Sequence, residues 1–177
     1  LFARICDICN VISDTDISLL PNYDYVIQSA PATEDLTYRQ LLSWIAEITG
    51  SCGFIDWNGR LILKWYSSTD TVLDLTNRFV SDLEENAIEI TGVQVVADEE
   101  TYLVGDDGYA LNIEGNELIQ HDHREVAQAL YDVLGGFTYT PFSATIKPMP
   151  HLYPLDTIKF VDKTGAEYTT VITDYTF

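Results

Sequence analysis

The stretch from Leu36 to Tyr66, LTYRQLLSWIAEITGSCGFIDWNGRLILKWY, contains the start and stop signals of one helix and one β-hairpin. Thr37 followed by Gln40 has the spacing of a capping box, in which each residue satisfies a backbone N–H of the other. Apolar residues then recur at helical spacing up to Gly50, and glycine readily adopts the left-handed conformation that ends helices. We therefore expect a helix between Thr37 and Gly50.

The hairpin signal is Asn58-Gly59, because both central positions of a type I′ turn need a positive φ. Pairing the strands outward from this turn assigns every side chain to one of two faces. The apolar face is predicted to hold Cys52, Phe54, Leu61, Leu63 and Trp65, with Asp56 near the tip. The other face mixes apolar and basic side chains, namely Ile55, Trp57, Arg60, Ile62 and Lys64. Since aromatic residues are enriched at interfaces, we expect these five predicted interface residues to contact a neighbouring domain or subunit.

The charge of the chain is strongly acidic. Its 177 residues include 9 basic and 28 acidic ones, a formal net charge of −19 at pH 7. This balance opposes binding to nucleic acid or anionic membranes, which depends on neutralising phosphates. A basic partner or a surface that repels DNA fits better, although acidic residues spread over solvated faces also explain most of the charge. No apolar run approaches the roughly 20 residues of a membrane-spanning helix.

Residue clusters that could carry chemistry have simpler explanations. Cys6 and Cys9 form a CxxC pair without a second ligand pair for zinc, so buried helix-face cysteines are the preferred interpretation. Among His121, Asp122 and His123, the aspartate is expected to cap a helix. The acidic turns at 98–100 and 106–107 do not have the ligand spacing of a helix-loop-helix calcium site. We expect no catalytic residue, metal or cofactor in this segment.

Along the chain we expect an α+β fold. Residues 1–68 read as an α+β helix and hairpin unit, 69–87 as a connector with a short turn of helix in RFVSDLEENA, and 88–177 as a mainly antiparallel β-barrel or sandwich with one helix. That helix begins at Asp122 and stops at Gly135-Gly136. The apolar helical period at the very start, without an initiator Met, suggests a piece of a longer chain.

The order of these segments resembles a known family. TYRQLLSWIAEITG, the NGRL hairpin, ITGVQV, YLVGDDGYALNIEGNELI, a helix, and FTYTPFSATIKPMPHLYPLDTIKFVDKTGAEYTTVIT together are similar to tail-hub proteins of siphophages and prophages. These proteins form the amino-terminal part of many tail-associated lysins (the prophage endopeptidase tail family) and are similar to the baseplate hub of contractile-tailed phages. The run Ile113 to Ile119 and the helix after it carry much of the resemblance.

The resemblance implies a minor structural protein of the virion. A homotrimeric ring would continue the tail tube at the tail tip, bind neighbouring tail proteins and let DNA pass without specific binding, after assembly in the host cytoplasm. An acidic lumen would repel the phosphates of that DNA. Two alternatives stay open: a fragment of a tail-associated cell-wall hydrolase, and a carbohydrate- or receptor-binding module.

Overall fold

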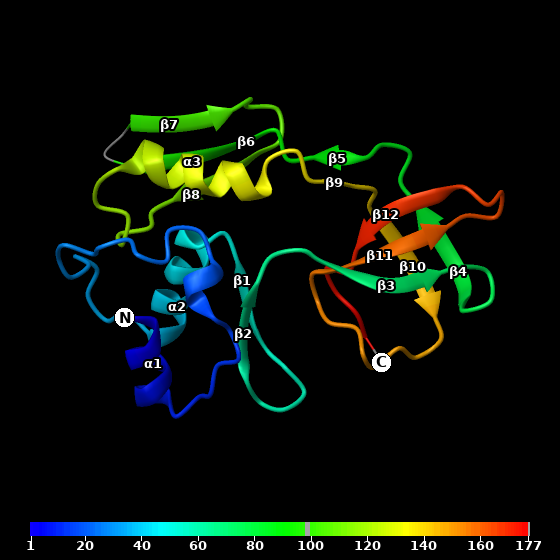
Figure 1. The fold of residues 1–177 in the computed structure, drawn as a ribbon, viewed down its shortest axis with the longest axis horizontal. Coiled ribbons are helices and arrows are strands. Elements are labelled where there is room, and N and C mark those ends of the chain that lie inside the picture. The colour runs from blue at the N-terminus through cyan, green and yellow to red at the C-terminus, as the bar shows by residue number, and fades with distance from the viewer. Residues whose placement is uncertain (98–99, 177) are drawn as a thin grey trace. The chain divides into compact units, whose positions relative to one another are not determined.

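The computed structural model describes residues 1–97 and 100–176 and divides into two compact units (Figure 1). Unit 1 consists of Leu1–Trp65 and Ile90–Gly136, and unit 2 consists of Tyr66–Glu89 and Phe137–Phe177. Both units therefore combine segments that are distant in sequence. This division does not follow the expected segments 1–68, 69–87 and 88–177, because 90–136 packs with the amino-terminal part of the chain.

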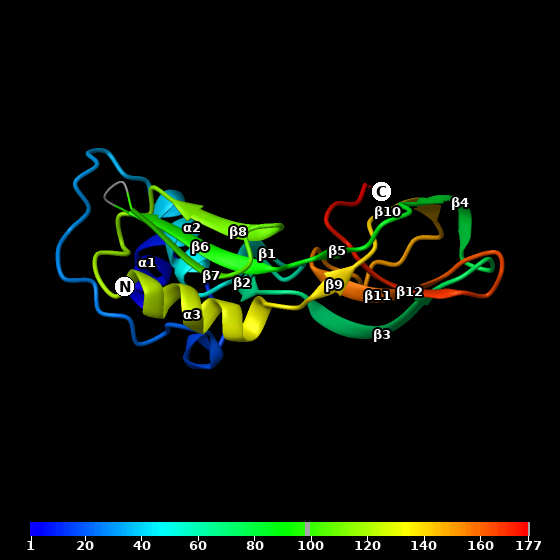
Figure 2. The same ribbon diagram turned by 90° about the horizontal axis from the view of Figure 1, so that it is seen from above.

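Unit 1 combines three α-helices and short strands in its described part. Its helices are α1 (Phe2–Cys9), the 3-10 helix η1 (Ile17–Leu19), α2 (Tyr38–Ile48) and α3 (His123–Leu134), and its strands are β1 (Cys52–Ile55), β2 (Leu61–Lys64), β6 (Gly92–Ala97), β7 (Glu100–Gly105) and β8 (Ala110–Glu114). Figures 1 and 2 show α3 lying along the sheet of β6, β7 and β8. The α+β class predicted from the sequence is confirmed.

The entry to α2 is the predicted capping box. The Thr37 hydroxyl accepts from the Gln40 amide at 3.2 Å, and the Gln40 side chain accepts from the Thr37 amide at 3.0 Å. Gly50 follows the helix with φ of 58°, as expected for a helix stop.

The hairpin turn differs from the predicted one, and as a result the side chains of β1 point to the faces opposite to those predicted. Ile55 pairs with Leu61, which leaves a loop whose ends, Asp56 and Arg60, are joined by an amide-to-carbonyl bond of 2.9 Å. Of the two turn residues, Gly59 has a positive φ and Asn58 does not, so the turn is not type I′. Because side chains alternate along a strand, the slip places Ile55 on the face of Leu61 and Leu63, and Phe54 on the face of Ile62 and Lys64. The predicted two-face assignment is wrong for Cys52, Phe54 and Ile55.

The sheet of unit 1 has the strand order β7-β6-β8. β7 is antiparallel to β6, as expected, but β8 runs parallel to β6 along its opposite edge. The loop 106–109, which connects β7 to β8, therefore crosses the end of β6, and β7 and β8 do not pair as a hairpin. The parallel β8 departs from the mainly antiparallel arrangement expected for 88–177.

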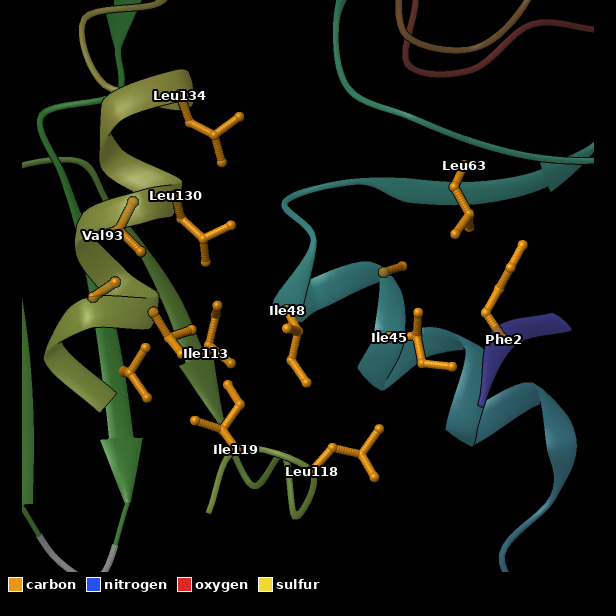
Figure 3. Close-up of a cluster of buried hydrophobic side chains, with 14 of the residues drawn as sticks. Phe2, Ile45, Ile48, Leu63, Val93, Ile113, Leu118, Ile119, Leu130 and Leu134 are labelled. Carbon is orange, nitrogen blue, oxygen red and sulfur yellow. The ribbon is translucent and has the colours of Figure 1, made fainter. Parts of the chain in front are cut away.

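The core of unit 1 brings the opening stretch together with the sheet (Figure 3). Side chains from α1, α2 and β2 contact those of β6, β8, α3 and the turn before α3. The buried residues labelled in Figure 3 are Phe2, Ile45, Ile48, Leu63, Val93, Ile113, Leu118, Ile119, Leu130 and Leu134. The helix and hairpin thus depend on 90–136 to bury their apolar face.

Unit 2 is formed by strands. They are β3 (Ser67–Leu73), β4 (Arg78–Leu83), β5 (Ile88–Glu89), β9 (Thr138–Tyr139), β10 (Phe142–Ile146), β11 (Asp156–Val161) and β12 (Glu167–Val171). One sheet has the order β12-β11-β3, with β3 parallel to β11, and β4 pairs antiparallel with β10. The expected connector 69–87, including its short turn of helix, is instead β3 and β4.

The sheets of unit 2 pack face to face around a second core. Leu73, Leu152, Ile158, Phe160 and Ile172 are buried in it, with Phe142 of β10 against Phe160 of β11 at 5.8 Å between ring centroids. The arrangement is sandwich-like, and the described strands do not close into a barrel.

Candidate functional site

The residues considered for chemistry do not come together as an active site. Cys6 is buried and Cys9 exposed on α1, and both are free thiols. The ring of His121 contacts Asp122, whereas the ring of His123 stacks on Tyr102 at 4.9 Å. Among residues 1–97 and 100–176, no three His, Cys, Asp or Glu side chains are placed to hold a metal ion. The acidic turn at 98–99 lies outside the described residues.

The predicted helix cap at Asp122 is wrong. Asp122 precedes α3 in the left-handed conformation (φ 50°), and its side chain makes no capping hydrogen bond. Its carboxylate instead lies 2.8 Å from Nδ1 of His121. The contact with the histidine therefore takes the place of the cap.

The predicted interface residues lie in two different settings. Ile55 and Trp57 at the tip of the hairpin are 57% and 55% exposed. Arg60 is held by Asp14, with 2.7 and 2.6 Å from Nη1 to the two carboxylate oxygens. Ile62 and Lys64 are partly buried on the opposite face of the strand from Leu61 and Leu63. The tip thus presents the exposed apolar pair, while Arg60 anchors the hairpin to the segment after α1.

A second exposed apolar group lies on unit 2. Leu75, Phe79 and Val80 are 63%, 69% and 69% exposed. Phe79 and Val80 are neighbours on β4, so their side chains point to opposite faces of the strand. β4 is therefore apolar and exposed on both faces at these positions.

The most extensive polar contact in unit 1 was not predicted from the sequence. Residues 20–33, which we call the strap, lie against the turn 116–121 before α3. Gln120 Oε1 accepts from the amides of Gln28 and Ser29, each at 2.9 Å. Glu117 accepts from the amide of Thr33 at 3.0 Å and from its hydroxyl, and these bonds lower the pKa of the glutamate.

The strap is also held by aromatic and amide side chains. The hydroxyl of Tyr25 accepts from the amides of Gln120 and His121 at 2.7 and 3.0 Å. The ring of Tyr25 stacks on that of His121 with centroids 4.7 Å apart. Asn22 Nδ2 donates to the carbonyl of Ile48, at the end of α2, at 2.9 Å. One feature of the sequence could have indicated these contacts: the strap is a long segment without apolar periodicity. The backbone groups of such a segment need hydrogen-bond partners from other parts of the chain.

An apolar cleft of about 260 Å³ lies beneath the strap. It is lined by side chains from the strap, α1, η1 and α2, among them Phe2, Ile17, Tyr25, Ile27 and Ile45. The described residues also include no helix long and apolar enough to cross a membrane.

Comparisons with known proteins give distant structural likenesses. No protein-family model matches the chain, and no curated protein matches it. Among solved structures, the 43 kDa tail protein of prophage MuSo2 from Shewanella oneidensis is similar at a TM-score of 0.49 and 17% identity, over 94% of this chain and 55% of that one. The tail protein from Neisseria meningitidis MC58 is similar at a TM-score of 0.48 and 14% identity, over 81% of this chain and 50% of that one. The chain thus spans about half the length of each of these two proteins.

Proposed function

We propose that the chain is a structural component of a phage or prophage tail: a hub-type ring protein that continues the tail tube and attaches tip or fibre proteins. The observation that carries the proposal is the order of segments in the sequence. The capped helix, the NGRL hairpin, the run 113–119 with its helix and the final strands follow one another as in tail-hub proteins. The proposed location is the tail tip of the virion, after assembly in the host cytoplasm.

Exposed apolar side chains support a role in assembly. Monomeric proteins keep large contiguous apolar patches off their surfaces, so such groups favour contact with another chain. Unit 2 exposes Leu75 and, on opposite faces of β4, Phe79 and Val80. Ile55 and Trp57 at the hairpin tip are a second exposed group, on unit 1. We propose these two groups as contact surfaces within a homotrimer or with neighbouring tail proteins.

The acidity supports a tube that conducts DNA without retaining it. Unit 1 contains 18 acidic and 5 basic residues, and unit 2 contains 10 acidic and 4 basic ones. Both units are therefore acidic, and a lumen lined by either one would repel phosphates. In this proposal the segment has no enzymatic activity of its own, so purified protein should leave peptidoglycan intact in a zymogram. Clearing of the peptidoglycan would favour a cell-wall hydrolase instead.

Copurification with phage particles tests the proposal. Host cells carrying the gene are induced, released particles are separated on a density gradient, and peptides of the chain are quantified by mass spectrometry. We expect the peptides in the tail-containing fractions, at a constant ratio to the tube protein. Peptides found only in fractions without tails would contradict a structural role in the tail.

A further inference from the structure

The ring of His121 has hydrogen-bond acceptors at both of its nitrogens. Nε2 lies 2.9 Å from the backbone carbonyl of Val26 in the strap, and Nδ1 lies 2.8 Å from the carboxylate of Asp122. A carbonyl and a carboxylate can only accept hydrogen bonds. A neutral imidazole carries one N–H and can satisfy one of them, whereas the imidazolium carries two and satisfies both.

From this geometry we propose that His121 fastens the strap over the apolar cleft of unit 1 in a protonation-dependent manner. With the ring protonated, one N–H holds Val26 and the other is held by Asp122, which fixes the orientation of the ring. On loss of the proton, the remaining N–H stays with the carboxylate of Asp122, which is the stronger acceptor, so the hydrogen bond to Val26 is lost and the strap is held less firmly.

The surroundings of the ring favour its charged form. Tyr25 from the strap stacks on the ring, and its hydroxyl is already engaged with the backbone of Gln120 and His121. Asp122 is the charged side chain in contact with the ring among the described residues. The carboxylate of Glu117, in the same turn, is engaged with the strap at Thr33. Two acceptors, the Val26 carbonyl and the Asp122 carboxylate, thus face the histidine, and the side chain of the left-handed Asp122 makes this contact in place of a helix cap.

The direction of the pH dependence follows from these contacts. The hydrogen bond to the Val26 carbonyl, and next that to Asp122, raise the pKa of His121 above its ordinary value of 6.5. A group whose pKa is raised in the folded state contributes fully at pH values below the unfolded pKa. That contribution is lost as the pH rises through the raised folded value. The strap should therefore be firm under mildly acidic conditions and looser under mildly alkaline ones.

The hydrogen bonds of the strap indicate which part of it opens first when the bond to Val26 is lost. Val26 lies between Tyr25 and the amides of Gln28 and Ser29 that Gln120 holds. Release of Val26 leaves the strap attached through Gln120 and Glu117 on one side and Asn22 on the other. We therefore expect local opening of the strap over the cleft lined by Tyr25 and Ile27, without unfolding of unit 1.

Amide hydrogen exchange tests the proposal on the complete chain. Protection factors, corrected for the intrinsic rate at each pH, are measured near pH 5.5 and pH 8.5 for the amides of Gln120 and His121, which the strap protects through the hydroxyl of Tyr25. In the wild-type protein we expect the protection of these two amides to fall several-fold at the higher pH, while the amides of α2 keep theirs. His121→Gln, which cannot become charged, should show no such fall. His151→Gln, a change at an exposed histidine of unit 2, should behave as the wild type does.

Two results would overturn the proposal: protection of these two amides that is equal at both pH values in the wild-type protein, or an unchanged pH dependence in His121→Gln. A second measurement needs no variant. The NMR titration of the His121 ring and the change in amide protection should share one midpoint above pH 6.5. Separate midpoints, or a lower midpoint for the ring, would contradict the fastening role.

Discussion

At the scale of single residues, Gly105 and Gly115 of unit 1 differ in how closely other atoms approach their Cα positions. Gly105 and Gly115 have similar positive φ angles, 87° and 71°. A Cβ built on Gly105 would lie 2.4 Å from the carbonyl oxygen of Thr91 and 2.7 Å from the ring of Tyr131. A Cβ on Gly115 would have no neighbour within 4 Å. The two positions therefore share a conformational requirement, and Gly105 has a packing requirement in addition.

This difference predicts different costs for the same substitution. Gly115→Ala should lower the free energy of unfolding by about 1–2 kcal/mol, the cost of a left-handed alanine. Gly105→Ala should cost more, because the β7 backbone has to move away from Thr91. Urea denaturation of both variants measures the difference. Equal losses would contradict the close approach of β7 to the chain before β6.

The aspartates that begin the two tight hairpin loops act in the same way. Asp56 and Asp162 each accept hydrogen bonds from amides two and four residues ahead, and each loop has a left-handed glycine three residues on. At Asp162 the hydroxyl of Thr164 also donates to the carboxylate, and this bond contributes most to lowering the pKa of Asp162 below its ordinary 3.8.

The lowered pKa predicts a pH-dependent effect of Asp162→Asn. The ionised carboxylate contributes above the unfolded pKa, and its contribution is lost as the pH falls through the lower folded value. The variant should therefore be less stable than wild type at pH 6, and the gap in Tm should narrow towards pH 2. Thermal melts across this range measure the gap, with exposed Asp174→Asn as the control. A gap that stays constant with pH would contradict the role of the charged form.

At the scale of elements, the hairpin shows how a turn determines a face. The loop between β1 and β2 has one left-handed residue, Gly59, and its ends close through Asp56 and Arg60. The β2 strand of this register buries Leu61 and Leu63 at 7% and 3% exposure, and leaves Ile62 partly exposed on the other face. The exposed β1 partners of Leu61 and Leu63 are Ile55 and Gly53.

The two faces of β2 predict unequal costs of truncation. Leu63→Ala removes a buried side chain of the unit 1 core and should lower the free energy of unfolding by about 2–5 kcal/mol. Ile62→Ala, the matched change on the other face, should cost clearly less. Chemical denaturation of both variants measures the two losses in the free energy of unfolding. A larger loss for Ile62→Ala than for Leu63→Ala would indicate that β2 has the opposite orientation.

Local signals in the sequence were sufficient for the elements whose stabilising contacts are local. The Thr37–Gln40 capping box and the glycine after α2 are both predicted and found. The direction of β8 and the strands of 69–87 could not be read in this way, because their partners are distant in sequence. The side chains of Glu117 and Gln120 carry no local signal either, since they accept hydrogen bonds from backbone amides of the strap 84–92 residues away.

At the scale of the whole molecule, the charge should matter for stability as well as for partners. A net charge of −19 opposes a compact state through self-repulsion, and salt screens that repulsion. We therefore expect the Tm to rise between low salt and about 0.5 M NaCl, where the Debye length is below 8 Å. Differential scanning fluorimetry measures the change. A Tm that falls with salt would indicate that attractive ion pairs such as Arg60–Asp14 outweigh the repulsion.

The proposed structural role in a phage tail can be checked by locating the chain on phage particles. Antibodies raised against the purified chain are coupled to gold and applied to phage or prophage particles released from the host, followed by electron microscopy. We expect label at the tip of the tail and no label on the capsid. Label that is absent from intact tails, with the same antibodies detecting the chain elsewhere in the lysate, would contradict it.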